Sequence, residues 1–236
     1  MSEGDLPPDA QAVVAAAPAR PQGRVLHIGK FFPPDRGGIE SYLADLIAQQ
    51  RAMGLEVAAL VHGQPQPDDP PWLIRVPVQM QVVYAPIALG MWPALLRALK
   101  AFQPDVLHLH MPNLAVFWAL FSHQAMAVPW VVHWHSDVMV NPNRVLLNLA
   151  YRFYEPLERR MLRGAQAIIA TSPAYLRDSK TLWPWRGKTV AIPLGLQELP
   201  GSREALGLPE VGGQPVPALA VGIESARPFR VLSLGL

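Results

Sequence analysis

Residues 24–61, RVLHIGKFFPPDRGGIESYLADLIAQQRAMGLEVAALV, contain the strand, helix and strand that decide the fold. The segment opens with the apolar run 24–28, and a second apolar run follows at 56–61. Between them, apolar residues recur at the spacing of a helix over 39–53, and a glycine ends that helix. This order of elements predicts a βαβ unit, whose two strands lie parallel in one sheet.

The same alternation of apolar runs and helical patterns continues beyond residue 61. Strands are expected at 106–110, 130–135, 167–171 and 189–192, and one or two extended segments, interrupted by Pro77, at 72–85. Helices are expected at 93–102, 114–127, 145–163 and 173–180, and the second of these is expected to be buried. The sequence therefore predicts an α/β fold built on a Rossmann-like, doubly wound parallel sheet.

Composition narrows the classes of protein to which this chain can belong. Of its 236 residues, 50% are hydrophobic and 16% are charged, and the net charge is +2, which excludes an intrinsically disordered chain. The absence of cysteine excludes disulfides, thiolate nucleophiles and cysteine-bound metals. In the charge-free stretch 106–136 the longest apolar run is 114–121, far short of the roughly 20 residues of a membrane span. The small net charge gives no indication of nucleic-acid binding.

Both ends of the chain differ in composition from the α/β segment, which is expected to form one domain over 24–196. Residues 1–23 lack the basic region of a signal peptide, and we expect them to form a disordered tail. Residues 197–228 are rich in glycine and proline, which is typical of a linker. The apolar run at 229–236 is expected to be the first strand of a second domain that is absent from the chain.

The loop after the first expected strand combines two glycines with basic side chains just before a helix. Gly37 and Gly38 would let the backbone approach a ligand closely, and the free N–H groups of a helix N-terminus favour an anion such as phosphate. Lys30 and Arg36 would add positive charge, whereas Asp35 would subtract some. Because the spacing matches neither a dinucleotide-binding fingerprint nor a P-loop, an ordinary glycine turn remains the alternative.

Two His-x-His pairs end two of the expected strands, His108 with His110 and His133 with His135. Because side chains alternate along a strand, each pair lies on one face, so the four imidazoles could converge. A metal site is one interpretation, but no carboxylate motif completes the set of ligands. A substrate contact is expected of His135, the outermost, and a core position of His108, while His133 could be a hydrogen-bonded core histidine.

The expected helix 145–163 is amphipathic and rich in arginine. Such a helix can lie on an anionic membrane surface or contact a polyanionic substrate. The other interpretation is a surface helix that packs against the sheet with its apolar face.

Five motifs occur in the order seen in family-4 glycosyltransferases. They are GKFFPPDRGGIE at 29–40, PDVLHLH at 104–110, HWHSD at 133–137, IIATSP at 168–173 and IPLG at 192–195. Over residues 24–200 the chain resembles the amino-terminal domain of those enzymes. The resemblance implies the amino-terminal half of a GT-B architecture, in which two Rossmann-like domains face a cleft, the first binding the acceptor and the second the nucleotide-sugar donor.

The activity implied by the resemblance is transfer of a sugar from a nucleotide-diphosphate sugar to a glycan or lipid-linked acceptor. Transfer with retention, no metal or other cofactor, and a role in polysaccharide or lipopolysaccharide synthesis are implied with it. The implied location is cytoplasmic, with peripheral contact at the inner face of the membrane through helix 145–163 as a further expectation. No nucleic-acid partner is expected.

The resemblance also implies a set of site residues. His135 would be the catalytic residue, lying beside the transferred sugar, and Ser136 and Asp137 would shape the same wall. Contact with substrate or with a donor or acceptor phosphate is implied for Gly37, Gly38, Lys30, Arg36 and His110, the first two through their backbone.

In relatives, the groups that hold the donor phosphates and an E-x7-E motif lie in the second domain, and no two glutamates of this chain have that spacing. The donor site is therefore expected to be incomplete, and this chain alone to be inactive or nearly so, because the groups that stabilise the leaving diphosphate are missing. The alternatives are a non-catalytic module that binds the acceptor or another subunit, a metal-dependent hydrolase and a nucleotide-sugar epimerase.

Overall fold

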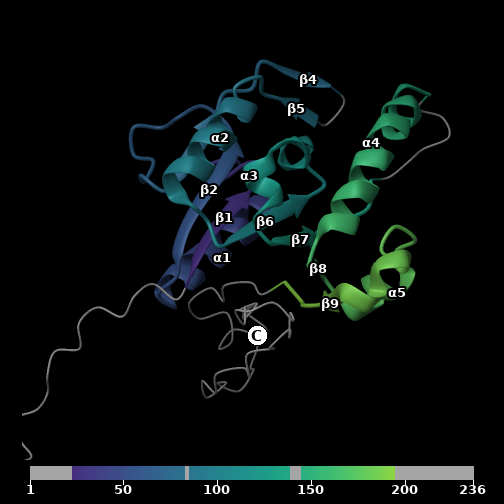
Figure 1. Cartoon of the computed structure of the whole chain (residues 1–236). Coiled ribbons are helices and arrows are strands. Elements are labelled where there is room, and N and C mark those ends of the chain that lie inside the picture. Colours follow the sequence, from purple (N-terminus) through teal and green to yellow (C-terminus); the bar gives the residue numbers. More distant parts are fainter. Residues whose placement is uncertain (1–22, 83–84, 139–144, 195–236) are drawn as a thin grey trace, which may run out of the picture.

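The computed structural model describes residues 23–82, 85–138 and 145–194. Seven strands form one parallel sheet in the order β3-β2-β1-β6-β7-β8-β9 (Figure 1). They are β1 (Arg24–Ile28), β2 (Glu56–His62), β3 (Leu73–Val76), β6 (Val106–Met111), β7 (Trp130–Trp134), β8 (Ala167–Ala170) and β9 (Thr189–Ala191). The strand order reverses between β1 and β6, as in a doubly wound Rossmann-like sheet, which confirms the predicted fold class. Ligands of such sheets bind at the carboxyl ends of the strands beside that reversal.

Helices connect the strands and cover the sheet. They are α1 (Gly38–Ala52), α2 (Met91–Phe102), the 3-10 helix η2 (Leu114–Phe121), α3 (His123–Met126), α4 (Val145–Gly164), α5 (Pro173–Asp178) and the 3-10 helix η3 (Trp183–Lys188). No helix in the described part of the chain is long and apolar enough to cross a bilayer.

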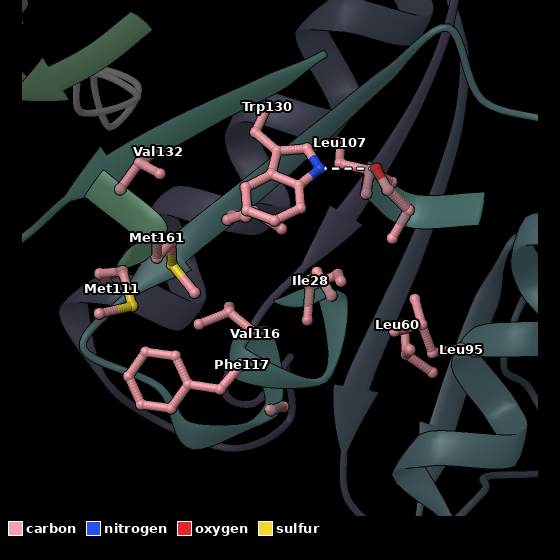
Figure 2. Close-up of a cluster of buried hydrophobic side chains, with 14 of the residues drawn as sticks. Ile28, Leu60, Leu95, Leu107, Met111, Val116, Phe117, Trp130, Val132 and Met161 are labelled. Carbon is pink, nitrogen blue, oxygen red and sulfur yellow. Dashed lines mark hydrogen bonds between the residues drawn. The ribbon is translucent and has the colours of Figure 1, made fainter. Parts of the chain in front are cut away.

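The larger core lies on the face of the sheet that receives Leu26 and Ile28 from β1. Side chains of α2, η2 and α4 pack there, among them Leu95, Phe117 and Met161 (Figure 2). On the opposite face, Leu43 and Ile47 of α1 pack against alternate residues of β2. Since neighbouring residues of a strand face opposite ways, His27 lies on the α1 side of the sheet.

One expectation about local structure was wrong, and another was confirmed. The single buried helix expected at 114–127 is two short helices, η2 and α3, because Ser122 between them has extended backbone angles and its hydroxyl accepts from Ala125 N–H at 3.2 Å. The extended segments expected at 72–85, interrupted by Pro77, are confirmed: β3 lies before the proline, and β4 (Met80–Val82) pairs after it with β5 (Ala85–Ile87) in a separate antiparallel hairpin.

The sequence pattern also left η3 unpredicted, and the remaining elements begin and end within two residues of their expected bounds. The expected tail at 1–23, apart from its last residue, and the linker and final strand at 197–236 lie outside the described residues. Those expectations stay predictions.

The turn after β1 requires a residue without a side chain at Gly29. A Cβ there would collide with Leu43 of α1 and lie 3.2 Å from Val61 Cγ1 of β2. We therefore expect Gly29→Val to lower the free energy of unfolding by about 1–3 kcal/mol, as overpacking of a core does. Urea denaturation measures this free energy of unfolding. Gly38→Ala is the matched control, because a Cβ at Gly38 meets no atom within 4 Å. Equal stability of the two variants would contradict this packing.

Candidate functional site

Five imidazoles stack beneath α1 and reach the carboxyl ends of β6 and β7. His27 lies opposite His108 in the sheet register, and His110 lies opposite His133. Neighbouring rings in the stack have centroids 4.4–5.5 Å apart, and His133 and His135 are within 7° of parallel. The predicted convergence of the four histidines of the two His-x-His pairs is confirmed, and His27 is a fifth member that the sequence analysis missed.

Hydrogen bonds join these rings in two groups. His27 Nδ1 lies 3.0 Å from His110 Nε2, and His110 Nδ1 lies 3.0 Å from His135 Nε2. His108 Nε2 and His133 Nδ1 form a separate, longer pair at 3.4 Å. Tyr42 of α1 packs edge-on against His133 and His135, with centroids at 4.9 and 5.7 Å. His135 is therefore held on two sides, by His110 and by the tyrosine ring.

Burial keeps the whole stack uncharged. It lowers the pKa of His27 and of His135 to about 4. The pKa values of His108, His110 and His133 fall well below their ordinary range, again mainly through burial and further through their neighbours. At pH 7 each ring is thus neutral, with one nitrogen that donates and one that accepts a hydrogen bond.

Two triads of the stack have nitrogen atoms close enough to share a metal ion. In His27, His108 and His110, and in His110, His133 and His135, one nitrogen of each ring lies within 4.8 Å of the others. The rings of the second triad lie within 15° of parallel, and two of them, His110 and His135, already bond to each other. The 3.0 Å contact of His110 with His135 fits a hydrogen bond, and the set resembles a hydrogen-bonded stack more than a metal centre.

The glycine loop leads into α1 as expected, but its helix N-terminus already faces a carboxylate. Gly37 is the N-cap residue and no side chain caps the helix. The carboxylate of Glu40 lies where a Cβ of Gly37 would be. An anion that binds the N–H groups there has to displace it. Gly37, Gly38 and Arg36 are exposed, and none of them lines the cavity described next.

A cavity of about 670 Å³ lies beside the loop that follows β7. Its walls are mostly apolar and include Ile87 of β5, Phe117 of η2 and Leu157 of α4, and Lys30 and Asp137 are its charged residues. Trp134 Nε1 donates to Asp137 Oδ1 at 2.9 Å, and Ser179 Oγ donates to the same oxygen at 3.0 Å. The structure thus brings Lys30 and Asp137 to one cavity, whereas Ser136 is exposed.

Helix α4 contributes a buried acid that the sequence analysis did not single out. Glu158 is 1% exposed, and burial raises its pKa to about 7. Tyr151, which lines the cavity, donates its hydroxyl to Glu158 Oε1 at 3.3 Å. The sequence signal was its place between Leu157 and Met161 on the apolar side of an otherwise charged helix.

The sequence is similar to a known protein family and to two glycosyltransferases. Residues 37–195 match the sequence family described as glycosyl transferase 4-like domain. The chain is 31% identical over 183 residues to O-antigen chain mannosyltransferase C of Escherichia coli. The aligned region covers 74% of this chain and 46% of that protein. It is 31% identical over 181 residues to D-rhamnosyltransferase WbpZ of Pseudomonas aeruginosa, with coverages of 74% and 45%. The chain therefore spans less than half the length of these two relatives.

Among solved structures, UDP-N-acetylglucosamine 2-epimerase from Rickettsia bellii can be aligned with this chain. The alignment covers 73% of this chain and 45% of the epimerase chain. The TM-score is 0.48 and the sequence identity 11%.

Proposed function

The chain belongs to the glycosyl transferase 4-like family, and from that premise we propose that it is the acceptor-side domain of a nucleotide-sugar-dependent glycosyltransferase. The family match confirms the resemblance given by the five motifs and the expected GT-B amino-terminal domain. The observation that carries the proposal is the position of His135, which follows β7 at the carboxyl edge of the sheet and is held by His110 of β6, a strand at the reversal. Ligands of doubly wound sheets bind at that edge.

Within this proposal His135 contacts the transferred sugar, and the cavity receives the acceptor. An apolar cavity of about 670 Å³ with one lysine suits a lipid-linked acceptor, whose chain is apolar and whose phosphates are anionic. Lys30 then contacts the anionic part, and Gly37 and Gly38 bind a phosphate once Glu40 moves aside. Asp137 shapes the wall, because Trp134 and Ser179 hold its carboxylate.

The names of the two relatives suggest mannose or rhamnose as the transferred sugar. We further propose transfer with retention and without a metal cofactor, as the family resemblance implies. The exposed Leu149 and Phe153 of α4, beside exposed arginines of the same helix, support peripheral contact with the cytoplasmic face of an anionic membrane.

The proposal is tested by acceptor binding to the isolated chain. We expect an octyl-diphosphate-linked hexose to bind and to shift amide NMR signals of His135, Asp137 and the cavity walls. Replacing Lys30 with glutamine is expected to weaken this binding roughly tenfold, the loss of about 1.4 kcal/mol expected for one charge-assisted contact. Calorimetry gives the affinities. Binding of an octyl hexoside without phosphate should be unchanged by the same substitution.

Lys100→Gln is the matched control, since Lys100 is an exposed lysine of α2 that does not line this cavity. Equal weakening of both ligands in Lys30→Gln would show that Lys30 supports the cavity without contacting phosphate. If neither ligand binds the unaltered chain, the acceptor role is wrong.

A further inference from the structure

A continuous line of hydrogen bonds runs from the middle of α1 to His135. Gln50 Oε1 lies 2.8 Å from His27 Nε2, and His27 Nδ1 lies 3.0 Å from His110 Nε2. His110 Nδ1 in turn lies 3.0 Å from His135 Nε2. Gln50, His27 and His110 are at most 6% exposed, so water does not compete for these contacts. Three elements, α1, β1 and β6, are thereby linked to the residue after β7.

The number of protons in this line allows only two arrangements. A neutral imidazole carries one N–H, so a ring that donates on one side must accept on the other. All three rings are neutral at pH 7 because burial lowers their pKa values. Every ring in the line therefore carries its hydrogen on Nε2, or every ring carries it on Nδ1.

Gln50 selects between these arrangements. Its carbonyl oxygen faces His27 Nε2, and a carbonyl oxygen can only accept. His27 must then donate from Nε2 and accept at Nδ1, and the same assignment passes to His110 and to His135. We propose that Gln50, acting through His27 and His110, holds His135 in the Nε2–H tautomer with an unprotonated Nδ1. Gln50 and His27 are positioning residues for His135.

The outer end of the line has a free acceptor. His135 Nδ1 is buried and has no hydrogen-bond partner among the described residues. A lone pair there accepts from a hydroxyl and repels a phosphate oxygen, so a ligand group that reaches it must be a donor. Because Nδ1 is buried, the atoms that cover it have to move for that contact. Its assignment to a sugar hydroxyl rests on the proposed function, whereas the tautomer of the free protein does not.

The line orients His135 and does not conduct protons away from it. A proton taken up at His135 Nδ1 could shift along the rings only as far as His27, because the amide oxygen of Gln50 is not a base. The neutral amide at the inner end therefore favours a ring that stays neutral, in keeping with the lowered pKa of His135.

The tautomers can be measured directly in the ligand-free chain. Long-range 1H–15N correlation spectra at pH 7.5 distinguish protonated from unprotonated ring nitrogens. We expect the hydrogen on Nε2 in His27, His110 and His135. In Gln50→Leu the Nδ1–H fraction of His135 should rise severalfold. Gln49→Leu makes the same change at the neighbouring, exposed position of α1 and should leave all three rings unaltered.

An Nδ1–H form of His135 in the unaltered chain would overturn the proposal without any variant, and so would an identical tautomer fraction in Gln50→Leu. Adding the octyl-diphosphate-linked hexose then tests the substrate step separately. A shift of the His135 Nδ1 signal supports a hydroxyl contact. An unchanged signal with the expected tautomers leaves the hydrogen-bond line intact and contradicts the sugar contact alone.

Discussion

Replacing Arg75 with methionine is expected to lower the free energy of unfolding by about 3 kcal/mol, as breaking a buried ion pair does. The Arg75 side chain is 2% exposed and its Nε donates to both oxygens of Asp69, at 2.9 and 3.0 Å. Its other nitrogens donate to the carbonyls of Phe32 and Pro33, in the loop between β1 and α1. Methionine fills similar volume but leaves the carbonyls of Phe32 and Pro33 without this donor, and the Asp69 carboxylate with the Gln66 N–H as its remaining one.

Urea denaturation measures this loss, and the ion pair of Arg24 with Glu56 provides the control. That pair has the same 2.9 Å separation, but its side chains are 32% and 50% exposed, so Arg24→Met should cost less than about 1 kcal/mol. Arg75→Lys keeps the positive charge but loses the planar set of donors of arginine. Its loss of stability should lie between those of Arg75→Met and Arg24→Met. Equal losses for Arg75→Met and Arg24→Met would mean that Arg75 does not hold the loop.

Arg75 also shows what the sequence could not predict. It lies on β3, more than 40 residues after the loop carbonyls that it binds, and no local pattern links a single arginine to a distant backbone. The seven strands of the sheet, by contrast, were all predicted, because buried parallel strands are short apolar runs bounded by turn residues. Local sequence patterns predict individual helices and strands. Contacts between distant helices and strands follow only from how these elements are arranged in space.

The histidine stack shows the same division. The two His-x-His pairs were predicted to converge because alternation along a strand is a local rule, and their convergence is confirmed. His27 was missed since it is the only histidine in its strand, and its place beside His108 depends on β1 pairing with β6. Gln50 carried one usable signal, since a polar residue follows Leu43 and Ile47 at helical spacing on the buried face of α1.

The helix expected at 114–127 failed for a different reason. Most of its residues are apolar, and the predicted burial holds for Val116, Phe117 and Leu120 but not for Trp118, Phe121 and Met126. A run that is apolar on all sides also has no period that separates a 3-10 helix from an α-helix. Asn113 and Ser122, whose side chains cap η2 and α3, were the available signs of two separate starts.

Lowering the pH from 7.5 to 5.5 is expected to remove about 5 kcal/mol of folding stability, which approaches the whole stability of many domains. In the folded chain the pKa values of His27 and His135 are lowered to about 4, and those of His108, His110 and His133 are lowered well below 6.5, the value of the free side chain. The unfolded chain therefore binds more protons in this range, and stability rises with pH. It is fully present above pH 6.5 and is lost as the pH falls toward 4.

Each histidine contributes about 1.4 kcal/mol per pH unit once the unfolded side chain is protonated. Glu158 acts in the opposite direction, because its raised pKa of about 7 lets the folded chain take up a proton first. This single acid offsets only part of the loss. Urea denaturation at a series of pH values gives the slope of the free energy of unfolding against pH, which is proportional to the number of protons bound on unfolding.

Replacing one member of the stack distinguishes this origin of the pH dependence from a general effect of acid. His108→Gln removes one titrating group, so its slope between pH 6.5 and 5 should be smaller by about one proton, whatever the variant's stability at pH 7.5. His123→Gln makes the same change at an exposed position of α3 and should keep the slope of the unaltered chain. An unaltered chain that binds one proton or fewer on unfolding in this range would mean that the stack is already charged when folded. A charged stack could not hold the single-proton hydrogen-bond line that ends at His135, so this measurement also bears on the orientation of the candidate catalytic residue.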